Sequence, residues 1–188
     1  MNKRSATARG WVLATAMALA TGLAVARAGT SAATPRTDSP CTRLASLSGH
    51  WTVRQSMWTD PAAPPVIDHG AATYAMVLGG HHLQQNLRIA SDKPFEGLGF
   101  IGYEDATGKY YSSWMDTHFS GIVLVRGDYD ASSRSYTFAG EMANKGGAPI
   151  PVREVMRIAD NDHFVYEYYE TRNGKEALAV SLQYTRVD

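Results

Sequence analysis

The chain has 188 residues with 18 basic and 18 acidic side chains, so its formal net charge is zero when the histidines are neutral. This balance excludes the strongly basic surface with which nucleic-acid-binding proteins hold a phosphate backbone. Its single cysteine, Cys41, excludes an intramolecular disulfide, and we expect the thiol to be inert.

The N-terminus has the layout of a secretory signal peptide. Three basic residues within the first nine precede an uncharged, mostly apolar stretch at 11–25. This stretch is shorter than the roughly 20 residues that a transmembrane helix needs. The sequence Ala26-Arg27-Ala28 offers cleavage after Ala28 or after Ala26. We therefore expect a signal peptide at 1–28 and a periplasmic or secreted mature protein without a membrane anchor.

The part that remains after cleavage divides into a leader and one domain. It carries 14 basic and 18 acidic side chains, a net charge of −4. Residues 29–40, GTSAATPRTDSP, are rich in small, polar and proline residues and are expected to form a flexible leader. Residues 41–188 are numerous enough to bury a core without a disulfide or a metal.

Strand patterns dominate this domain. A short helical turn is expected at 42–48, with Thr42 as its N-cap. Turn signals such as Gly79-Gly80 and Asn173-Gly174 then separate β-rich runs. The ten expected strands are 50–58, 71–78, 82–90, 96–103, 110–116, 122–129, 136–142, 152–158, 164–170 and 176–186. Their short connections predict an all-β fold, a single antiparallel up-and-down barrel, with a Greek-key sandwich as the alternative.

Alternation within the last run predicts which side chains share a face. Leu178, Val180, Leu182 and Tyr184 are two residues apart, so they are expected on one side of the strand. The smaller and polar residues between them are expected on the other side.

The two ends of the domain carry residues suited to closing a barrel. Gly49-His50-Trp51 begins the first run, and Arg186 ends the last. In a closed barrel these strands are neighbours, so the guanidinium can stack on the indole. A helical turn, a Gly-x-Trp and a late basic residue resemble the calycin superfamily, the lipocalins and fatty-acid-binding proteins. The resemblance implies that Gly49, Trp51 and Arg186 close one end of the barrel.

A more extensive resemblance covers nearly the whole domain. The segments LSGHW, LGGHHL, FEGLGFIGYEDATGKYYSSWMDT, GIVLVRGDYD and SLQYTR resemble, in order, successive blocks of the bacterial DUF1579 family. The chain departs from the usual pattern at Glu104-Asp105, where a lone Asp is common, and at His81, where Arg is more usual. This resemblance implies the fold and no particular activity.

Two patterns that can hold cofactors or metals are incomplete. The stretch 97–102, GLGFIG, matches a dinucleotide-binding string, but it lies within a strand pattern rather than before a helix. Glycines there are expected to mark bends or close backbone approach. The six histidines lack the spacing of a metal site, and none stands out as an axial ligand to haem. We expect no metal and no cofactor.

Asp116 and His118 form the most suggestive catalytic pattern. If the strand continues through both, they share a face, and the carboxylate can orient the imidazole as a general base. The alternative is that Asp116 accepts hydrogen bonds in a turn.

A ligand site in the barrel would need aromatic walls and a polar anchor. We expect it at Tyr74, Phe100, Trp114, Tyr166 and Glu167. The strand residues Glu141, Glu154 and Glu167 would each have a raised pKa if they pointed inward. An outward orientation is favoured for these three because acidic residues are rarely buried without a partner.

Three functions remain open from the sequence. The first is an exported protein that binds a small, apolar molecule inside the barrel. The second is an enzyme of lyase, isomerase or cyclase type that uses Asp116 and His118 in the same cavity. The third is a filled barrel that acts through contacts with other proteins.

Overall fold

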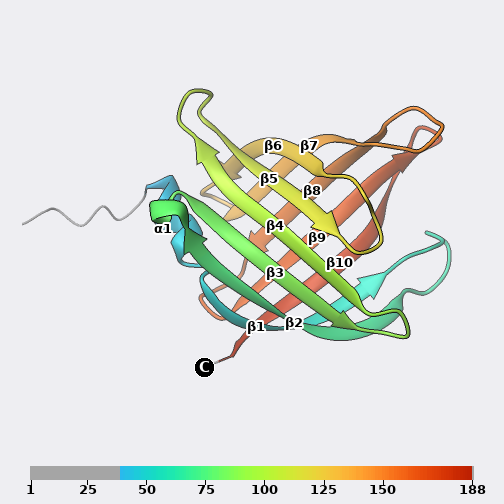
Figure 1. The fold of residues 1–188 in the computed structure, drawn as a ribbon, viewed down its shortest axis with the longest axis horizontal. Coiled ribbons are helices and arrows are strands. Elements are labelled where there is room, and N and C mark those ends of the chain that lie inside the picture. Colours follow the sequence, from blue (N-terminus) through green and yellow to red (C-terminus); the bar gives the residue numbers. More distant parts are fainter. Residues whose placement is uncertain (1–38, 188) are drawn as a thin grey trace, which may run out of the picture. The chain divides into compact units, whose positions relative to one another are not determined.

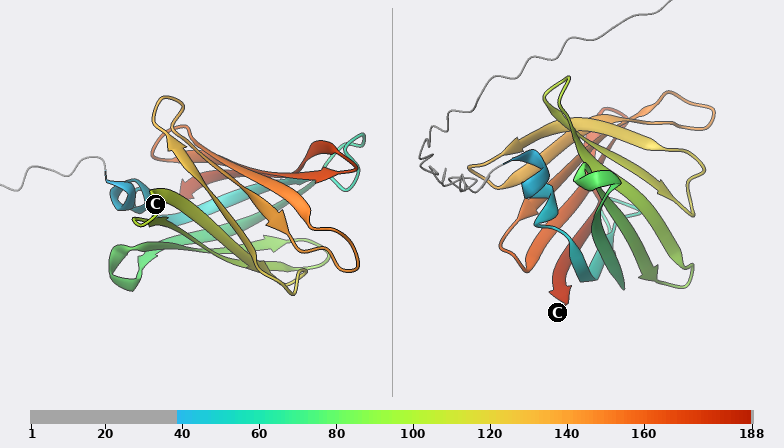
Figure 2. Two further views of the ribbon diagram at one scale, coloured as in Figure 1. Left: turned by 90° about the horizontal axis from the view of Figure 1, so that it is seen from above. Right: turned by 60° about the vertical axis from the view of Figure 1, so that its left-hand side comes forward.

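The structure, a computed structural model, describes residues 39–187 as an all-β barrel with a short helix. Ten antiparallel strands follow one another in chain order around the barrel, and β1 (Gly49–Met57) closes it by pairing with β10 (Lys175–Val187) (Figure 1; Figure 2). The predicted up-and-down barrel is confirmed, and the sandwich alternative is wrong. The expected signal peptide and nearly all of the leader lie outside the described residues.

All ten predicted strands are present within this part of the chain: β3 has the predicted bounds, and the other nine have changed ends. The other strands are β2 (Val66–Val77), β3 (His82–Ala90), β4 (Phe95–Glu104), β5 (Lys109–Asp116), β6 (Val123–Asp130), β7 (Ser135–Met142), β8 (Ile150–Ile158) and β9 (His163–Arg172). A 3-10 turn, η1 (Leu78–Gly80), joins β2 to β3.

The largest difference is at β2, which begins at Val66 rather than at residue 71. Val66 pairs with Met57, so the strand includes Gly70, although glycine is a residue typical of turns. At Gly70 a Cβ atom would lie 2.0 Å from the carbonyl oxygen of Arg88 on β3. Glycine is therefore required there by close backbone approach within the sheet, not by a turn.

The helix α1 (Pro40–Ala45) begins earlier than predicted. Ser39, not Thr42, is the N-cap: its hydroxyl accepts a hydrogen bond from the Thr42 backbone amide at 3.1 Å. Pro40 lies in the first turn, where its missing amide hydrogen removes no helical hydrogen bond. Leu44 is fully buried and belongs to the barrel core. Within residues 39–187 there is no helix with the length and apolar character needed to span a membrane.

A β-bulge changes the face of one residue on β10. Leu178 pairs with Tyr169, whereas Val180 pairs with the preceding residue of β9, Tyr168. Leu178 therefore lies on the opposite side of the sheet from Val180, Leu182 and Tyr184, and its predicted position with them is wrong. The bulge adds one residue to β10 and so shifts the alternation.

Candidate functional site

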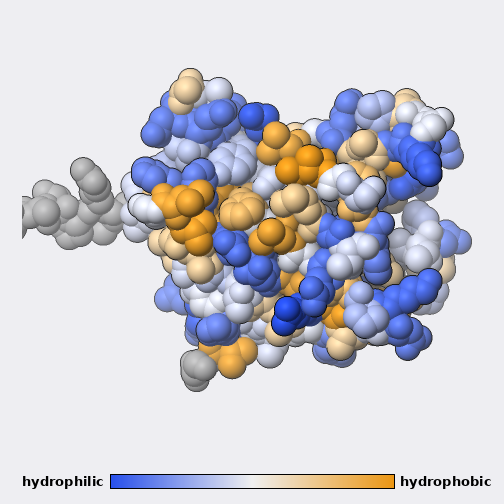
Figure 3. Space-filling view, viewed as in Figure 1, coloured by the Kyte–Doolittle hydropathy of each residue, from blue (hydrophilic) through white to orange (hydrophobic). Residues whose placement is uncertain are grey.

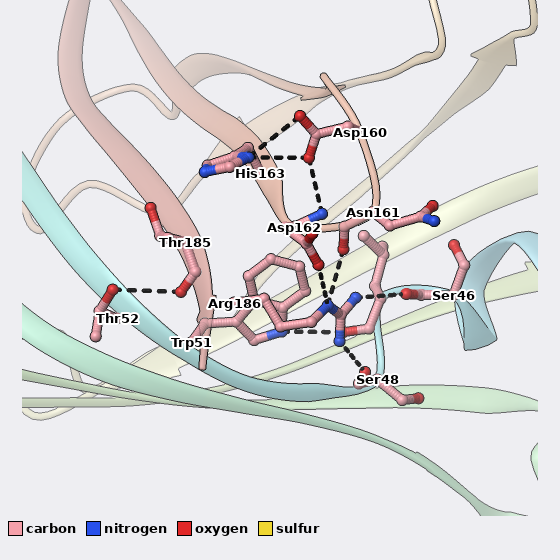
Figure 4. A network of polar contacts seen from close by, with 11 residues as sticks. Ser46, Ser48, Trp51, Thr52, Asp160, Asn161, Asp162, His163, Thr185 and Arg186 are labelled. Carbon is pink, nitrogen blue, oxygen red and sulfur yellow. Dashed lines mark hydrogen bonds and ion pairs between the residues drawn. The ribbon is translucent and has the colours of Figure 1, made fainter. Parts of the chain in front are cut away.

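One end of the barrel is closed by Trp51 and Arg186 (Figure 4). The buried indole of Trp51 donates from Nε1 to the carbonyl of Leu47, at 3.1 Å. The Arg186 guanidinium carbon lies 4.1 Å from the indole centroid. Its nitrogens also donate to the backbone carbonyls of Ser46, Ser48 and Asn161, at 2.7–2.9 Å. One guanidinium thus ties together the segment after α1, strand β10 and the loop before β9.

Gly49 makes room for this guanidinium. Its φ is +143°, a region that other residues rarely adopt, and a Cβ atom would lie 2.4 Å from an Arg186 nitrogen. Inside the closed end, aromatic rings fill the barrel, with Phe164 stacked on Tyr184 at a centroid distance of 4.1 Å. This end of the barrel is therefore packed with its own side chains.

A cavity of about 450 Å³ occupies the interior beyond these rings. Its walls are mainly apolar and aromatic, with a few polar groups, as is usual for small-molecule sites. Residues of all ten strands contribute, among them Leu87, Ile101, Trp114, Phe138, Met156, Tyr166, Tyr168, Val180 and Leu182. The barrel is therefore not completely filled by its own side chains.

Glu154 on β8 is the most unusual group in this wall. It is 2 % exposed, and its Oε2 atom has no hydrogen-bond partner. Burial raises its pKa to about 7, although the nearby hydroxyls of Ser112 and Tyr166 act in the opposite direction. The outward orientation favoured from the sequence is wrong for Glu154, which lies on the inner face with Val152 and Met156.

A second polar group lies deeper, among the aromatic rings. Gln85 donates from Nε2 to the Tyr184 hydroxyl at 3.0 Å. Tyr74 also hydrogen-bonds Tyr184, and burial raises the pKa of both tyrosines. These hydroxyls therefore remain neutral at physiological pH.

Four carboxyl groups line the cavity, besides three tyrosines and one histidine. Asp68 and Asp116 lie at the ends of β2 and β5 towards the open end, and Glu170 lies on β9. His118 is the sole basic residue among the lining residues, and no lysine or arginine belongs to them. The cavity therefore presents hydrogen-bond acceptors and negative charge.

Asp116 and His118 both line the cavity near its open end, but β5 ends at Asp116. Asp116 accepts hydrogen bonds from the Trp114 indole at 2.9 Å and from the backbone amides of His118 and Phe119 at 2.8 and 2.9 Å. Its carboxylate thus caps the turn after β5. His118 is exposed, and its ring contacts Phe95 edge-on, with 5.4 Å between centroids.

The residues expected to bind a ligand divide between the two faces of the sheet. Tyr74, Trp114 and Tyr166 line the cavity. Phe100 and Glu167 do not: each neighbours an inward residue, and strand alternation puts it on the outside. There Glu167 pairs with Arg157 and accepts a hydrogen bond from Tyr169 at 2.7 Å.

The glycines of the 97–102 string serve to accommodate large side chains. A Cβ atom at Gly97 or Gly99 would lie 2.0 or 2.9 Å from the ring of Trp114. At Gly102 it would lie 2.4 Å from the Tyr111 hydroxyl on the outer face. Strand β4 continues through all three glycines and is followed by β5, so the helix that a dinucleotide site requires is replaced by a strand.

A second depression, of about 650 Å³, lies on the outside of β2–β5. It is crossed by the Arg88–Glu96 ion pair, at 3.2 Å, and both side chains are largely exposed. On the face drawn in Figure 3, hydrophobic and hydrophilic residues are interspersed. The interior cavity is the stronger candidate because it alone of the two contains a buried carboxylate with an unused acceptor atom.

Solved structures resemble the chain in fold, and one family model matches its sequence. The crystal structure of Rv2717c from M. tuberculosis has a TM-score of 0.60 and 18% identity, covering 80% of this chain and 99% of that one. A de novo designed fluorescence-activating β-barrel has a TM-score of 0.43 and 11% identity, covering 77% of this chain and 98% of its own. No curated protein matches. The family model for DUF1579, described as a protein of unknown function, matches residues 37–186, and the chain therefore belongs to the DUF1579 family.

Proposed function

We propose that this protein is exported and binds a small, largely apolar molecule inside its barrel. The observation that carries the proposal is the interior cavity of about 450 Å³, in which an otherwise apolar wall holds Glu154 with an unpartnered Oε2. An unpaired buried carboxylate is costly to folding, so its presence in a cavity favours a role in binding.

The two alternatives have less support from the geometry. A filled barrel that acts by protein contact does not need an interior cavity. An enzyme that uses Asp116 and His118 needs a carboxylate free to orient the imidazole, whereas both oxygens of Asp116 already accept hydrogen bonds. The binding function therefore comes first.

A ligand screen with a cavity-blocking variant tests the proposal. Val123 and Leu124 are adjacent on β6, but Val123 is 4 % exposed and lines the cavity, whereas Leu124 is 45 % exposed on the outside. We expect a ligand at about 100 times its Kd to raise the Tm by roughly 5–10 °C in the wild type and in Leu124→Trp. Val123→Trp should lose this rise because its indole occupies the cavity.

The same ligand-induced rise in Val123→Trp would contradict binding in the interior. Each variant is compared with its own ligand-free Tm, because overpacking by Trp lowers the starting stability by itself.

Export is tested on the full-length chain in a Gram-negative host. We expect the mature protein in the periplasm or medium to begin at Gly29, or at Arg27 if cleavage follows Ala26. N-terminal sequencing or intact-mass measurement distinguishes these products. A charged residue in the apolar stretch, Leu13→Arg, should leave the uncleaved precursor inside the cell. Recovery of an intact wild-type chain beginning at Met1 would contradict export.

A further inference from the structure

The charges inside the cavity indicate the class of ligand. Four carboxylates line it, from Asp68, Asp116, Glu154 and Glu170, and no lysine or arginine does. A ligand with a carboxylate or phosphate head would have to enter this negative field without a lysine or arginine partner, which is strongly unfavourable in a buried site. A fatty acid is therefore a poor fit.

The four carboxylates differ in burial and in what they can still accept, and Asp68 is only partly buried, near the open end. Asp116 caps its turn through Oδ1 and accepts from the Trp114 indole through Oδ2, and Glu170 pairs with Arg172 at 2.7 Å. Glu154 is the deeply buried one, and its Oε2 remains without a partner. The most deeply buried carboxylate of the cavity thus keeps one acceptor oxygen unused.

We propose that the ligand is an amphiphilic amine, with its apolar body against the cavity wall and its ammonium group on Glu154. This inference rests on the proposed function. An ammonium group supplies both the hydrogen-bond donor and the opposite charge that a buried carboxylate needs. The aromatic wall also suits a cation, because ring faces attract positive charge. The carboxylates nearer the open end would attract the positively charged ligand into the cavity.

The groups that face Glu154 leave its charge uncompensated. The hydroxyls of Ser112 on β5 and Tyr166 on β9 lower its pKa, while Tyr168 on β9 and Tyr74 on β2 are further titratable neighbours. Burial raises the pKa of all three tyrosines, so they stay neutral near pH 7. The pKa of about 7 means that Glu154 changes its charge between pH 6 and 8, and amine binding should require its ionised form.

Isothermal titration calorimetry tests this inference with three probes that share a ten-carbon chain and differ in the head group: decylamine, 1-decanol and decanoate. At pH 8 we expect decylamine to bind on the order of tenfold or more tightly than 1-decanol, and decanoate to bind weakest. Because the pKa of Glu154 is raised to about 7, decylamine should bind about tenfold more tightly at pH 8 than at pH 6. The Kd of 1-decanol should change little over this range.

Two variants identify the responsible carboxylate. Glu154→Gln keeps the shape of the side chain, and we expect it to lose both the preference for decylamine and the pH dependence of its binding. Glu141→Gln makes the same change on the exposed outer face of β7 and should behave as the wild type.

The outcomes separate this inference from the proposed function. If 1-decanol or decanoate binds as tightly as decylamine, or if Glu154→Gln keeps the amine preference, the amine assignment is overturned. Loss of that binding in Val123→Trp would still support the cavity as a binding site. If none of the three probes binds and the wider screen finds no stabilising ligand, the proposed function itself is overturned.

Discussion

Glu154→Gln should make the folded barrel more stable at alkaline pH and remove most of its pH dependence between pH 5 and 8. The pKa of Glu154 is raised from 4.5 to about 7 in the folded protein. Below pH 4.5 the Glu154 carboxyl group is protonated in both the folded and the unfolded protein, and its stabilising contribution to folding is fully present. That contribution is lost as the pH rises through 7, the pKa in the folded protein. A shift of this size corresponds to about 3 kcal/mol of the free energy of unfolding.

Urea denaturation at several pH values measures this effect. We expect the free energy of unfolding of the wild type to fall by about 3 kcal/mol relative to Glu154→Gln between pH 5 and 8, and to change little above that range. Glu141→Gln, on the outer face, should run parallel to the wild type. Parallel curves for Glu154→Gln and the wild type would show that the carboxyl group is not perturbed by burial.

Trp51→Ala should cost about 3–5 kcal/mol of the free energy of unfolding, a typical loss for a fully buried aromatic side chain. Trp51 is 1 % exposed and contacts Phe164 edge-on, with 4.7 Å between centroids. Its truncation also removes the surface on which the Arg186 guanidinium stacks. The closed end would then lose its main packing element.

Trp58→Ala is the matched control, because Trp58 follows β1 directly and is only partly buried. We expect a cost of about 1 kcal/mol or less there. Urea unfolding curves with equal m-values allow the two variants to be compared. Equal losses for the two tryptophans would contradict a special role of Trp51 in closing the barrel.

The strand order could be predicted because local signals mark it. Gly79-Gly80 and Asn173-Gly174 adopt positive φ values between paired strands, as their composition predicts. The early start of β2 could not be predicted in this way, since Gly70 owes its identity to the Arg88 carbonyl on another strand. The bulge beside Leu178 likewise depends on pairing between β9 and β10.

The site was harder to predict than the fold. Arg153 and Arg157 are four residues apart on β8 and therefore lie on the same face of the sheet. Both pair with glutamates of the outer face. Two cations at this spacing indicate the outer face and thus an inward Glu154 between them. The general rarity of buried, unpaired carboxylates predicts the opposite, an outward Glu154. That rule holds for most proteins but not for this cavity.

Other features of the site depend on packing across strands. The sequence around Trp114 does not reveal that its ring covers Gly97 and Gly99 on β4. The position of Glu167 on the outside follows from the register of β9, which alternation alone leaves undetermined. A pattern of period two separates two faces, and additional charged residues are needed to tell which face is inside.

Native mass spectrometry of protein purified without detergent tests most directly whether the barrel interior is a binding site. We predict one bound small molecule per chain in the wild type and in Leu124→Trp, and none in Val123→Trp. The extracted compound should carry a basic nitrogen. A wild-type spectrum without bound mass, or the same bound mass in Val123→Trp, would contradict the account.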